Sequence, residues 1–330
     1  MMSFLVFVLL FSATVQAQNE GQYTHFMFNR LSYNPAFAGS SGNISATVLY
    51  RSQWMGLTLQ APTPGGDAGS TPTNILFSFD MPVSWLHGGI GLNFTSEKYG
   101  YHTNNTIAVD YAFRIFWGPG TLAAAVEADL QSYNFETGSL IGSSGMSGDP
   151  TAGSSSNDPA ITDNKSDFLV DVSTGLYYQV PSVYYVGLSV KNLLASHSDD
   201  LNLTNNRTVY LMGGYEYMFP YNQSFKLKPS ALVKTANFSV FQVDLACLLD
   251  YENTFWGGLS YRIGDAVNFL VGVHFMQMLR IGVAYDLTTS KLGFGNGRSF
   301  GSLEVFLNGY FQINIPEKKP TVSGNTLYLR

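Results

Sequence analysis

The chain has 330 residues, of which 45% are hydrophobic, 15% are aromatic and only 12% are charged, and its formal net charge is −6. Soluble globular proteins carry about 25% charged residues, so this chain lacks about half of the charge that a water-facing surface normally carries. Its aromatic content excludes a disordered chain, its single cysteine, Cys247, excludes a disulfide scaffold, and its acidic balance argues against a nucleic-acid partner.

The N-terminal residues have the pattern of a secretory signal peptide. Residues 4–11 form an unbroken apolar run, and residues 15–17 (Val-Gln-Ala) fit the small-residue site at which signal peptides are cleaved. The run is too short for a membrane anchor, which needs about 20 apolar residues. We therefore expect residues 1–17 to be removed and the mature chain to begin at Gln18.

No later segment supplies the 18 consecutive apolar residues of a membrane-spanning helix. An exported chain that is poor in charge and rich in aromatics then favours a closed β-barrel, because a barrel satisfies every backbone polar group inside the hydrocarbon layer. The sequence predicts an all-β fold, a transmembrane antiparallel β-barrel with short periplasmic turns and longer extracellular loops.

Residues 18–42 precede the first predicted strand and are rich in aromatic side chains without alternating. Pro35 discourages a central strand, yet apolar residues such as Phe26, Leu31 and Phe37 must be buried. We expect a plug-like periplasmic segment that packs against or into the mouth of the barrel. An exposed surface kept for a partner is the alternative.

Period-2 alternation predicts the barrel itself over residues 43–315. In residues 302–315 the odd positions are apolar or glycine and the even positions are mostly polar, and residues 106–115 and 239–250 alternate in the same way. A helical period would mix the two sets. About fourteen strands are predicted, over residues 43–51, 73–80, 88–96, 104–115, 121–135, 167–179, 183–191, 207–218, 225–235, 239–250, 254–263, 267–275, 280–287 and 302–313.

The lengths of the connections set the expected topology, because outer-membrane barrels have short periplasmic turns and long external loops. The longer connections, which we expect outside, are residues 52–72, 136–166, 192–206 and 288–301. Loop 136–166 is dominated by Gly, Ser, Asn and Asp, and its aspartates offer at most a weak structural Ca²⁺ site without EF-hand spacing. We expect a solvated external loop there, and a polar tail over residues 316–330 in the periplasm.

Charged residues on the polar faces of the predicted strands form an expected lumen polar network. Their mixed signs allow salt bridges across the lumen, whereas an ion-selective pore favours one sign. A generally polar barrel interior is the plainer explanation. The pattern supports a narrow or plugged lumen, and a solute channel is the alternative. The set comprises Asp110, Arg114, Glu127, Asp129, Glu216, Asp244, Arg262, Arg280 and Asp286.

Catalytic and cofactor chemistry has little support in this sequence. No two of the five histidines share a metal-ligand spacing, and nothing resembles a nucleophile elbow. Cys247 falls on the apolar face of its predicted strand, so it is expected to be an inert thiol that faces lipid. We expect neither an enzyme nor a cofactor.

Two stretches carry a family resemblance. Residues 34–39 read Asn-Pro-Ala-Phe-Ala-Gly and residues 50–57 read Tyr-Arg-Ser-Gln-Trp-Met-Gly-Leu, with weaker matches at residues 111–115 and 185–193. The sequence resembles the PorP/SprF-like membrane proteins of the type IX secretion system. The residues that carry this signature, as partner-binding or structural positions, are Asn34, Pro35, Gly39, Arg51, Gln53 and Trp54.

The resemblance implies an outer-membrane barrel that serves protein secretion. Some members support export of a large adhesin and hold its C-terminal domain at the cell surface during gliding motility. Others associate with the periplasmic ring proteins PorK and PorN and with a peptidoglycan-binding lipoprotein. The long external loops favour the adhesin role, in which the partners are outer-membrane lipid and the adhesin.

Arg51, Gln53 and Trp54 lie at the external end of the first predicted strand. They are expected to shape a loop that meets the partner. In the alternative, Trp54 belongs to the aromatic girdle at the membrane interface and Arg51 pairs with an acid in the lumen.

Overall fold

The structure is a computed structural model that describes residues 21–55, 71–100, 102–135, 165–276, 278–290 and 299–311. Within these ranges, no helix has the length and apolar character that crossing a membrane would require. Three predicted features lie outside the described residues: the signal peptide, the weak calcium site and the tail 316–330. Of loop 136–166, only residues 165 and 166 are described.

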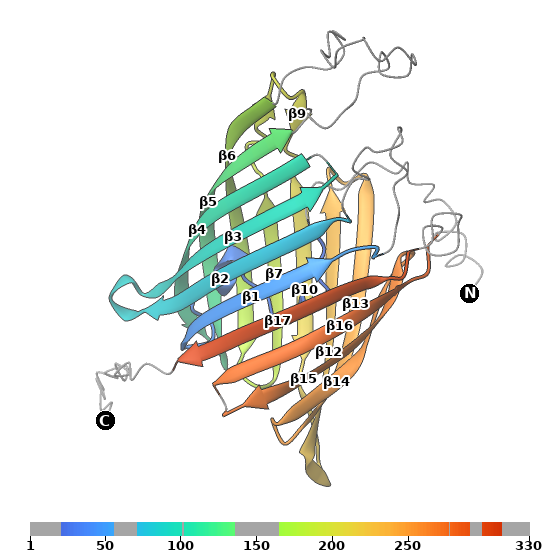
Figure 1. The fold of residues 1–330 in the computed structure, drawn as a ribbon. Coiled ribbons are helices and arrows are strands. Elements are labelled where there is room, and N and C mark those ends of the chain that lie inside the picture. The colour runs from blue at the N-terminus through green and yellow to red at the C-terminus, as the bar shows by residue number, and fades with distance from the viewer. Residues whose placement is uncertain are drawn as a thin grey trace, which may run out of the picture.

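One antiparallel sheet closes on itself into a barrel (Figure 1). Each strand pairs with its neighbour in the chain, and β1 pairs with β17 to close the ring. β10 and β11 are two parts of one passage that breaks at Glu216, and both pair with β12, so the barrel has fourteen passages. The strands are β1 (Ile44–Ser52), β2 (Thr73–Val83), β3 (Gly88–Tyr99), β4 (His102–Trp117), β5 (Gly120–Phe135), β6 (Lys165–Val180), β7 (Tyr184–Lys191), β10 (Thr208–Tyr215), β11 (Tyr217–Phe219), β12 (Asn222–Ala236), β13 (Val240–Tyr251), β14 (Phe255–Arg262), β15 (Ala266–Phe275), β16 (Leu279–Thr288) and β17 (Ser302–Phe311).

Three shorter features complete the described chain. β8 (His197–Ser198) and β9 (Leu203–Thr204) pair in the connection between β7 and β10, and two 3₁₀ turns, η1 (Pro35–Phe37) and η2 (Ser84–Leu86), flank β1 and β2. β1 begins and β17 ends at the same end of the barrel, where Ile44 is opposite Phe311. Because the termini of outer-membrane barrels lie in the periplasm, that end is periplasmic.

The predicted alternation is confirmed along the strands. In β13, Leu245, Cys247 and Leu249 are exposed on the outer face, and Asp244 and Asp250 are buried on the inner face. The outer face of the barrel is apolar because it meets lipid, and the inner face carries the polar and charged groups.

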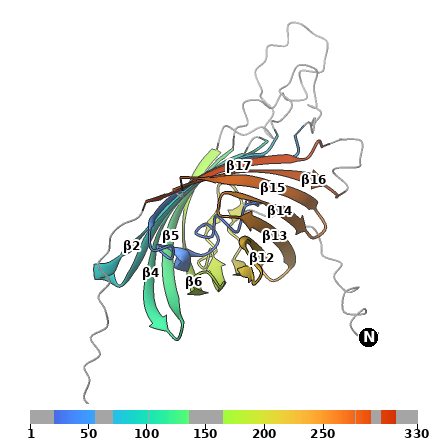
Figure 2. The ribbon, with the colours of Figure 1, turned by 90° about the horizontal axis from the view of Figure 1, so that it is seen from below.

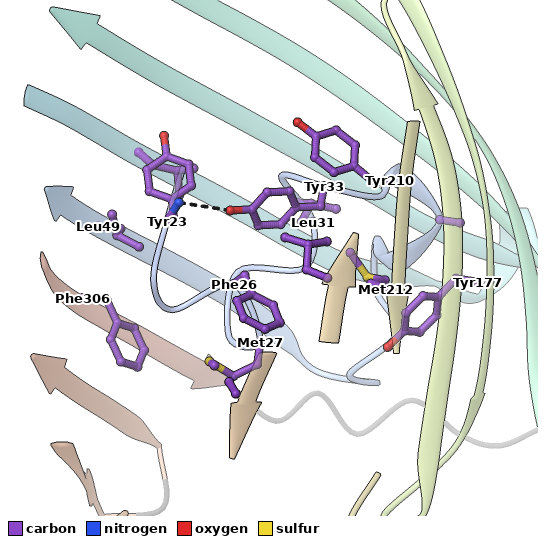
Figure 3. Packing of buried hydrophobic residues seen from close by; sticks show 14 of the residues in the cluster. Tyr23, Phe26, Met27, Leu31, Tyr33, Leu49, Tyr177, Tyr210, Met212 and Phe306 are labelled. Carbon is purple, nitrogen blue, oxygen red and sulfur yellow. Dashed lines mark hydrogen bonds between the residues drawn. The ribbon is translucent and has the colours of Figure 1, made fainter. Parts of the chain in front are cut away.

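Residues 21–43, which we call the plug, lie inside the ring of strands (Figure 2). The core of the protein is the contact between this segment and the inner barrel wall. Phe26, Met27 and Leu31 of the plug are between 2% and 5% exposed, and Leu49 and Phe306 of the wall are buried against the same cluster (Figure 3). The buried apolar side chains of the plug therefore share one cluster with the inner wall.

Candidate functional site

The N-terminal half of the plug is held by charged side chains of the barrel wall. Arg51 on β1 lies directly opposite Glu304 on β17, so both side chains point to the same face of the sheet. Asp286 on the neighbouring strand β16 completes the group. These three side chains meet Thr24 and His25 of the plug, and we call the five residues the ion-pair anchor.

The distances within the ion-pair anchor are those of strong, charge-assisted hydrogen bonds. Arg51 Nη2 lies 2.6 Å from Asp286 Oδ2, and its Nη1 lies 3.0 Å from Glu304 Oε2. Glu304 also accepts the backbone N–H groups of Thr24 at 2.7 Å and of His25 at 2.8 Å. The Thr24 hydroxyl donates to Asp286 at 2.8 Å and accepts from Arg51 at 2.8 Å.

Burial makes the ion-pair anchor costly to disrupt. The side chains of Arg51, Asp286 and Glu304 are at most 2% exposed. A buried charge that loses its partner costs about 3–5 kcal/mol, because water does not replace the lost interaction. The network continues from Asp286 to Arg262 at 3.8 Å and from Arg262 to Asp244 at 3.2 Å. The charges of several wall strands therefore converge on one end of the plug.

The C-terminal half of the plug is held mainly through its backbone and the Asn34 amide. The Asn34 side chain accepts the N–H of Ala36 at 2.9 Å, which caps the turn η1, and donates to the carbonyl of Leu176 at 2.9 Å. Gly175 and Gly187 make this approach possible, because a Cβ at either position would lie 2.2 Å and 2.7 Å from the Asn34 amide. The barrel wall is thus recessed where Asn34 docks.

Gly39 ends this half of the plug in a left-handed conformation, with φ +66°. Its N–H donates to Asp80 at 2.8 Å, and Arg114 donates to the carbonyls of Ala38 and Gly39. A Cβ on Gly39 would lie 2.7 Å from the Met81 carbonyl oxygen. The position therefore requires glycine both for its backbone conformation and for lack of space. Residues 34–40 with these partners form the backbone anchor.

The middle of the plug is bound through aromatic rings. Arg30 donates to the Tyr177 hydroxyl at 3.1 Å, and its guanidinium lies 3.8 Å from the centre of the Tyr185 ring. Tyr33 contacts Tyr210 edge-on at 5.3 Å. These contacts place a cation on an aromatic face.

The signature residues therefore divide between three places. Asn34, Pro35 and Gly39 form the backbone anchor, where Pro35 begins η1. The structure buries Arg51 in the lumen, where it pairs with Glu304 and Asp286. Gln53 and Trp54 follow the end of β1, where the Gln53 N–H donates to the Pro72 carbonyl at 2.8 Å and the Trp54 N–H donates to Ser302 Oγ at 3.1 Å.

The nine charged residues predicted for the lumen do not form one network. Asp244, Arg262 and Asp286 join the ion-pair anchor, and Arg114 belongs to the backbone anchor. Arg280 lies 4.6 Å from the centre of the Phe28 ring, and Glu216 pairs with Lys226 at 3.4 Å near the periplasmic end. A separate group lines the wall of β4 and β5 and comprises Asp110, Glu127 and Asp129.

Several partners were absent from the sequence prediction. Lys191 binds Glu127 at 2.8 Å, and Asp250 binds both Lys228 at 2.9 Å and His274 at 3.2 Å. Thr24, His25 and Glu304 were also absent. Alternation placed Glu304 on a polar face, but its meeting with Arg51 depends on the closure of the first strand onto the last.

The plug lies between two cavities. One lies between the plug and the external half of β3–β7, and the other lies at the periplasmic end beside Arg30 and Lys228. Among the described residues, no group of three or more His, Cys, Asp or Glu side chains is arranged to hold a metal ion. The arrangement holds one segment of the chain against the inner wall.

Comparison with known proteins adds a family match. A family model described as "Type IX secretion system membrane protein PorP/SprF" matches residues 15–307. No curated protein sequence matches the chain. Among solved structures, it is similar to the outer membrane protein Omp33 of Acinetobacter baumannii, with 8% identity, 82% of this chain and 98% of that chain covered, and a TM-score of 0.44. It is also similar to a Pseudomonas aeruginosa FadL homologue, with 13% identity, 84% and 92% covered, and a TM-score of 0.45. These similarities concern the fold alone.

Proposed function

The chain belongs to the PorP/SprF family of type IX secretion system membrane proteins, and from this premise we propose that it anchors an exported adhesin at the cell surface by the adhesin's C-terminal domain. The protein is an outer-membrane β-barrel. The proposal concerns its partner and the face of the barrel that meets it.

The observation that carries the proposal is the buried plug. Its two anchors bind opposite ends of residues 21–43 to the wall, one through the buried ion pairs of Arg51 and the other through the backbone around Gly39. Displacing the plug would expose both sets of partners at once. A barrel filled in this way is a rigid platform, which suits retention of a bound protein better than passage of a solute.

The external end is the face on which an exported protein arrives. There the described connection between β7 and β10 carries its own small sheet, β8–β9, in which the His197 ring and the Thr204 hydroxyl lie 2.7 Å apart. Two longer connections leave the barrel at the same end, between β1 and β2 and between β5 and β6. These connections supply an area for docking on the correct side of the membrane.

The proposal is tested in native cells that lack the protein and are complemented with the wild-type chain or a variant. We expect the wild-type chain to restore adhesin that is accessible to external protease and to co-purify with it from detergent extracts. A variant with a shortened β8–β9 hairpin serves as the external lesion, and a variant with a shortened β11–β12 hairpin serves as the matched periplasmic lesion. If only the variant with the shortened β11–β12 hairpin lost surface adhesin, the adhesin would not dock on the external face, and the proposal would be wrong.

A second candidate function has its own observation. The hairpin formed by β11 and β12 extends below the rest of the barrel (Figure 1), and its Tyr221 is fully exposed. An exposed aromatic projection suits contact with a periplasmic component such as PorK, PorN or a peptidoglycan-binding lipoprotein. Recovery of those proteins, and no adhesin, by affinity purification would favour this function.

Solute transport is the remaining alternative. We propose that the plugged barrel conducts poorly, and that the protein acts by binding rather than by catalysis. Purified protein in planar bilayers should give little ion current, and deletion of residues 21–40 should raise the current strongly. A large steady current from the wild-type chain would instead support a channel.

A further inference from the structure

A polar cavity lies between the plug and the wall formed by β3–β7. Its volume is about 750 Å³ with the solvent space included. Ser32 and Tyr33 of the plug line one side, and Glu97, Gln131 and Asn192 place it near the external ends of the strands. We call it the external cavity, and neither of the two anchors uses it.

The external cavity is lined by buried polar atoms without hydrogen-bond partners. They are Asn93 Oδ1, Asn104 Oδ1, Asn205 Nδ2 and the hydroxyl of Tyr23, and each residue is at most 5% exposed. An unsatisfied buried polar group costs about 1–3 kcal/mol. Three of the four atoms, the two asparagine oxygens and the Tyr23 hydroxyl, can accept a hydrogen bond, so they point to a polar ligand that donates.

The lining of the cavity carries more negative than positive groups. Glu97, Glu127 and Asp129 contribute three carboxylates, and Lys191 contributes one ammonium group, which binds Glu127 at 2.8 Å. Glu97 accepts the N–H of Gly21 at 2.8 Å, and Asp129 accepts from Gln131 at 2.7 Å. With these groups in their usual ionised states the lining carries a net charge of −2, so it favours a cation.

We propose that the external cavity binds a basic side chain, the ammonium of a lysine or the guanidinium of an arginine, on a polypeptide that approaches from outside. This inference rests on the proposed function, because an exported partner is the polypeptide that reaches this face. A lysine or arginine side chain offers three to five N–H donors and no acceptor. Those donors match the free oxygens of Asn93 and Asn104 and the carboxylates of Glu97 and Asp129.

A neutral saccharide matches the cavity less well. Its hydroxyl groups would satisfy the asparagines but would leave the net charge of the lining uncompensated. The chain that precedes Gly21 is a competing occupant, because Gly21 itself lines the cavity. The test therefore includes a neutral saccharide and a variant that lacks the residues before Gly21.

The test is a calorimetric titration of the purified full chain in detergent with trilysine, triglutamate and maltotriose. We expect saturable binding of trilysine that weakens as salt is added. A double variant, E97Q with D129N, keeps the shape of the cavity but removes two charges, and it should bind trilysine at least about tenfold more weakly. The matched control E252Q makes the same change on an exposed acid at a periplasmic turn and should bind like the wild type.

A variant of opposite sign keeps the test informative if the double variant does not fold. Asn104→Asp adds a carboxylate at the cavity wall and should tighten trilysine binding several-fold. Trilysine binding that is unchanged in both variants, equal binding of maltotriose, or binding that appears only after residues 18–20 are removed would each overturn the inference. Adhesin retention in cells is measured separately, so the proposed function stands or fails independently of this titration.

Discussion

The two anchors hold one segment by different physical means. The ion-pair anchor holds Thr24 and His25 through the charges of Arg51, Asp286 and Glu304. The backbone anchor holds residues 34–40 through carbonyl and N–H groups and through close packing against glycine. The first depends on charge that must be balanced, and the second depends on space that must be empty.

This difference indicates which substitutions each end tolerates. Long arginine and glutamate side chains absorb small shifts of the wall, so the ion-pair anchor should tolerate changes in volume and fail when one charge is removed. The backbone anchor has no slack around Gly39, because a Cβ added there would lie within 2.8 Å of backbone atoms of Met81 and Pro82. It should fail when a methyl group is added.

The largest effect is expected from Arg51→Met, which keeps the volume and removes the charge. Asp286 and Glu304 then lose the arginine that they share, although Arg262 and His25 remain nearby. We expect a loss of about 3–5 kcal/mol in the free energy of unfolding. The measurement is urea unfolding of the barrel in detergent, followed by tryptophan fluorescence and by far-UV circular dichroism.

Two controls make this prediction specific to charge balance. Arg207→Met removes an exposed arginine at the external end and should cost less than about 1 kcal/mol. A triple variant, R51M with D286N and E304Q, removes all three charges and should recover part of the lost stability. If the triple variant were less stable than R51M by the sum of the single effects, charge balance would not be the cause.

The second effect is expected from Gly39→Ala in the backbone anchor. The added Cβ meets the Met81 carbonyl and also requires a left-handed alanine, which itself costs about 1–2 kcal/mol. We expect a total loss of about 2–3 kcal/mol, measured by the same unfolding experiment.

Gly42→Ala is the matched control for that substitution. Gly42 has φ +72°, but a Cβ there meets nothing within 4 Å. Its cost should therefore be that of the backbone conformation alone, about 1–2 kcal/mol. Equal losses for the two variants would show that packing against Met81 contributes nothing.

The barrel and the plug also differ in how far the sequence predicts them. A wall between lipid and a polar lumen imposes a period of two, and the predicted strand at residues 104–115 lies within the observed β4, His102–Trp117. The predicted strand at residues 207–218 is in fact two, β10 and β11, because the pairing breaks at Glu216. Alternation predicts which residues face inward. It does not reveal where the pairing of a strand is locally interrupted.

The contacts of the plug could not be predicted from the sequence, for a different reason. Glu304 meets Arg51 across 253 positions of the chain, and this pairing follows from the register of barrel closure, which no local pattern reports. Asn34 and Gly39 were identified through the family resemblance alone. Their roles, an amide docked against two glycines and a left-handed turn against Asp80, became visible only with the wall in place.

A smaller effect is expected from Asn34→Ala. The variant loses the cap on η1 and the hydrogen bond to the Leu176 carbonyl, but it leaves room beside Gly175 and Gly187 rather than a clash. Loss of a cap costs about 1 kcal/mol and loss of one further hydrogen bond costs up to a similar amount, so we expect about 1–2 kcal/mol in the unfolding measurement. A loss as large as that of Arg51→Met would erase the proposed distinction between the anchors.

The smallest effect is expected from Tyr33→Phe, between the two anchors. The Tyr33 hydroxyl accepts the Tyr23 N–H at 3.3 Å, which is a long hydrogen bond, and the ring contacts with Tyr23 and Tyr210 survive in phenylalanine. The free energy of unfolding should fall by about 0.5 kcal/mol. Tyr33→Ala removes the ring as well and should cost about 3 kcal/mol or more. Because the middle of the plug is held by packing, a large loss on removal of the hydroxyl alone would mean that a third polar anchor exists between the other two.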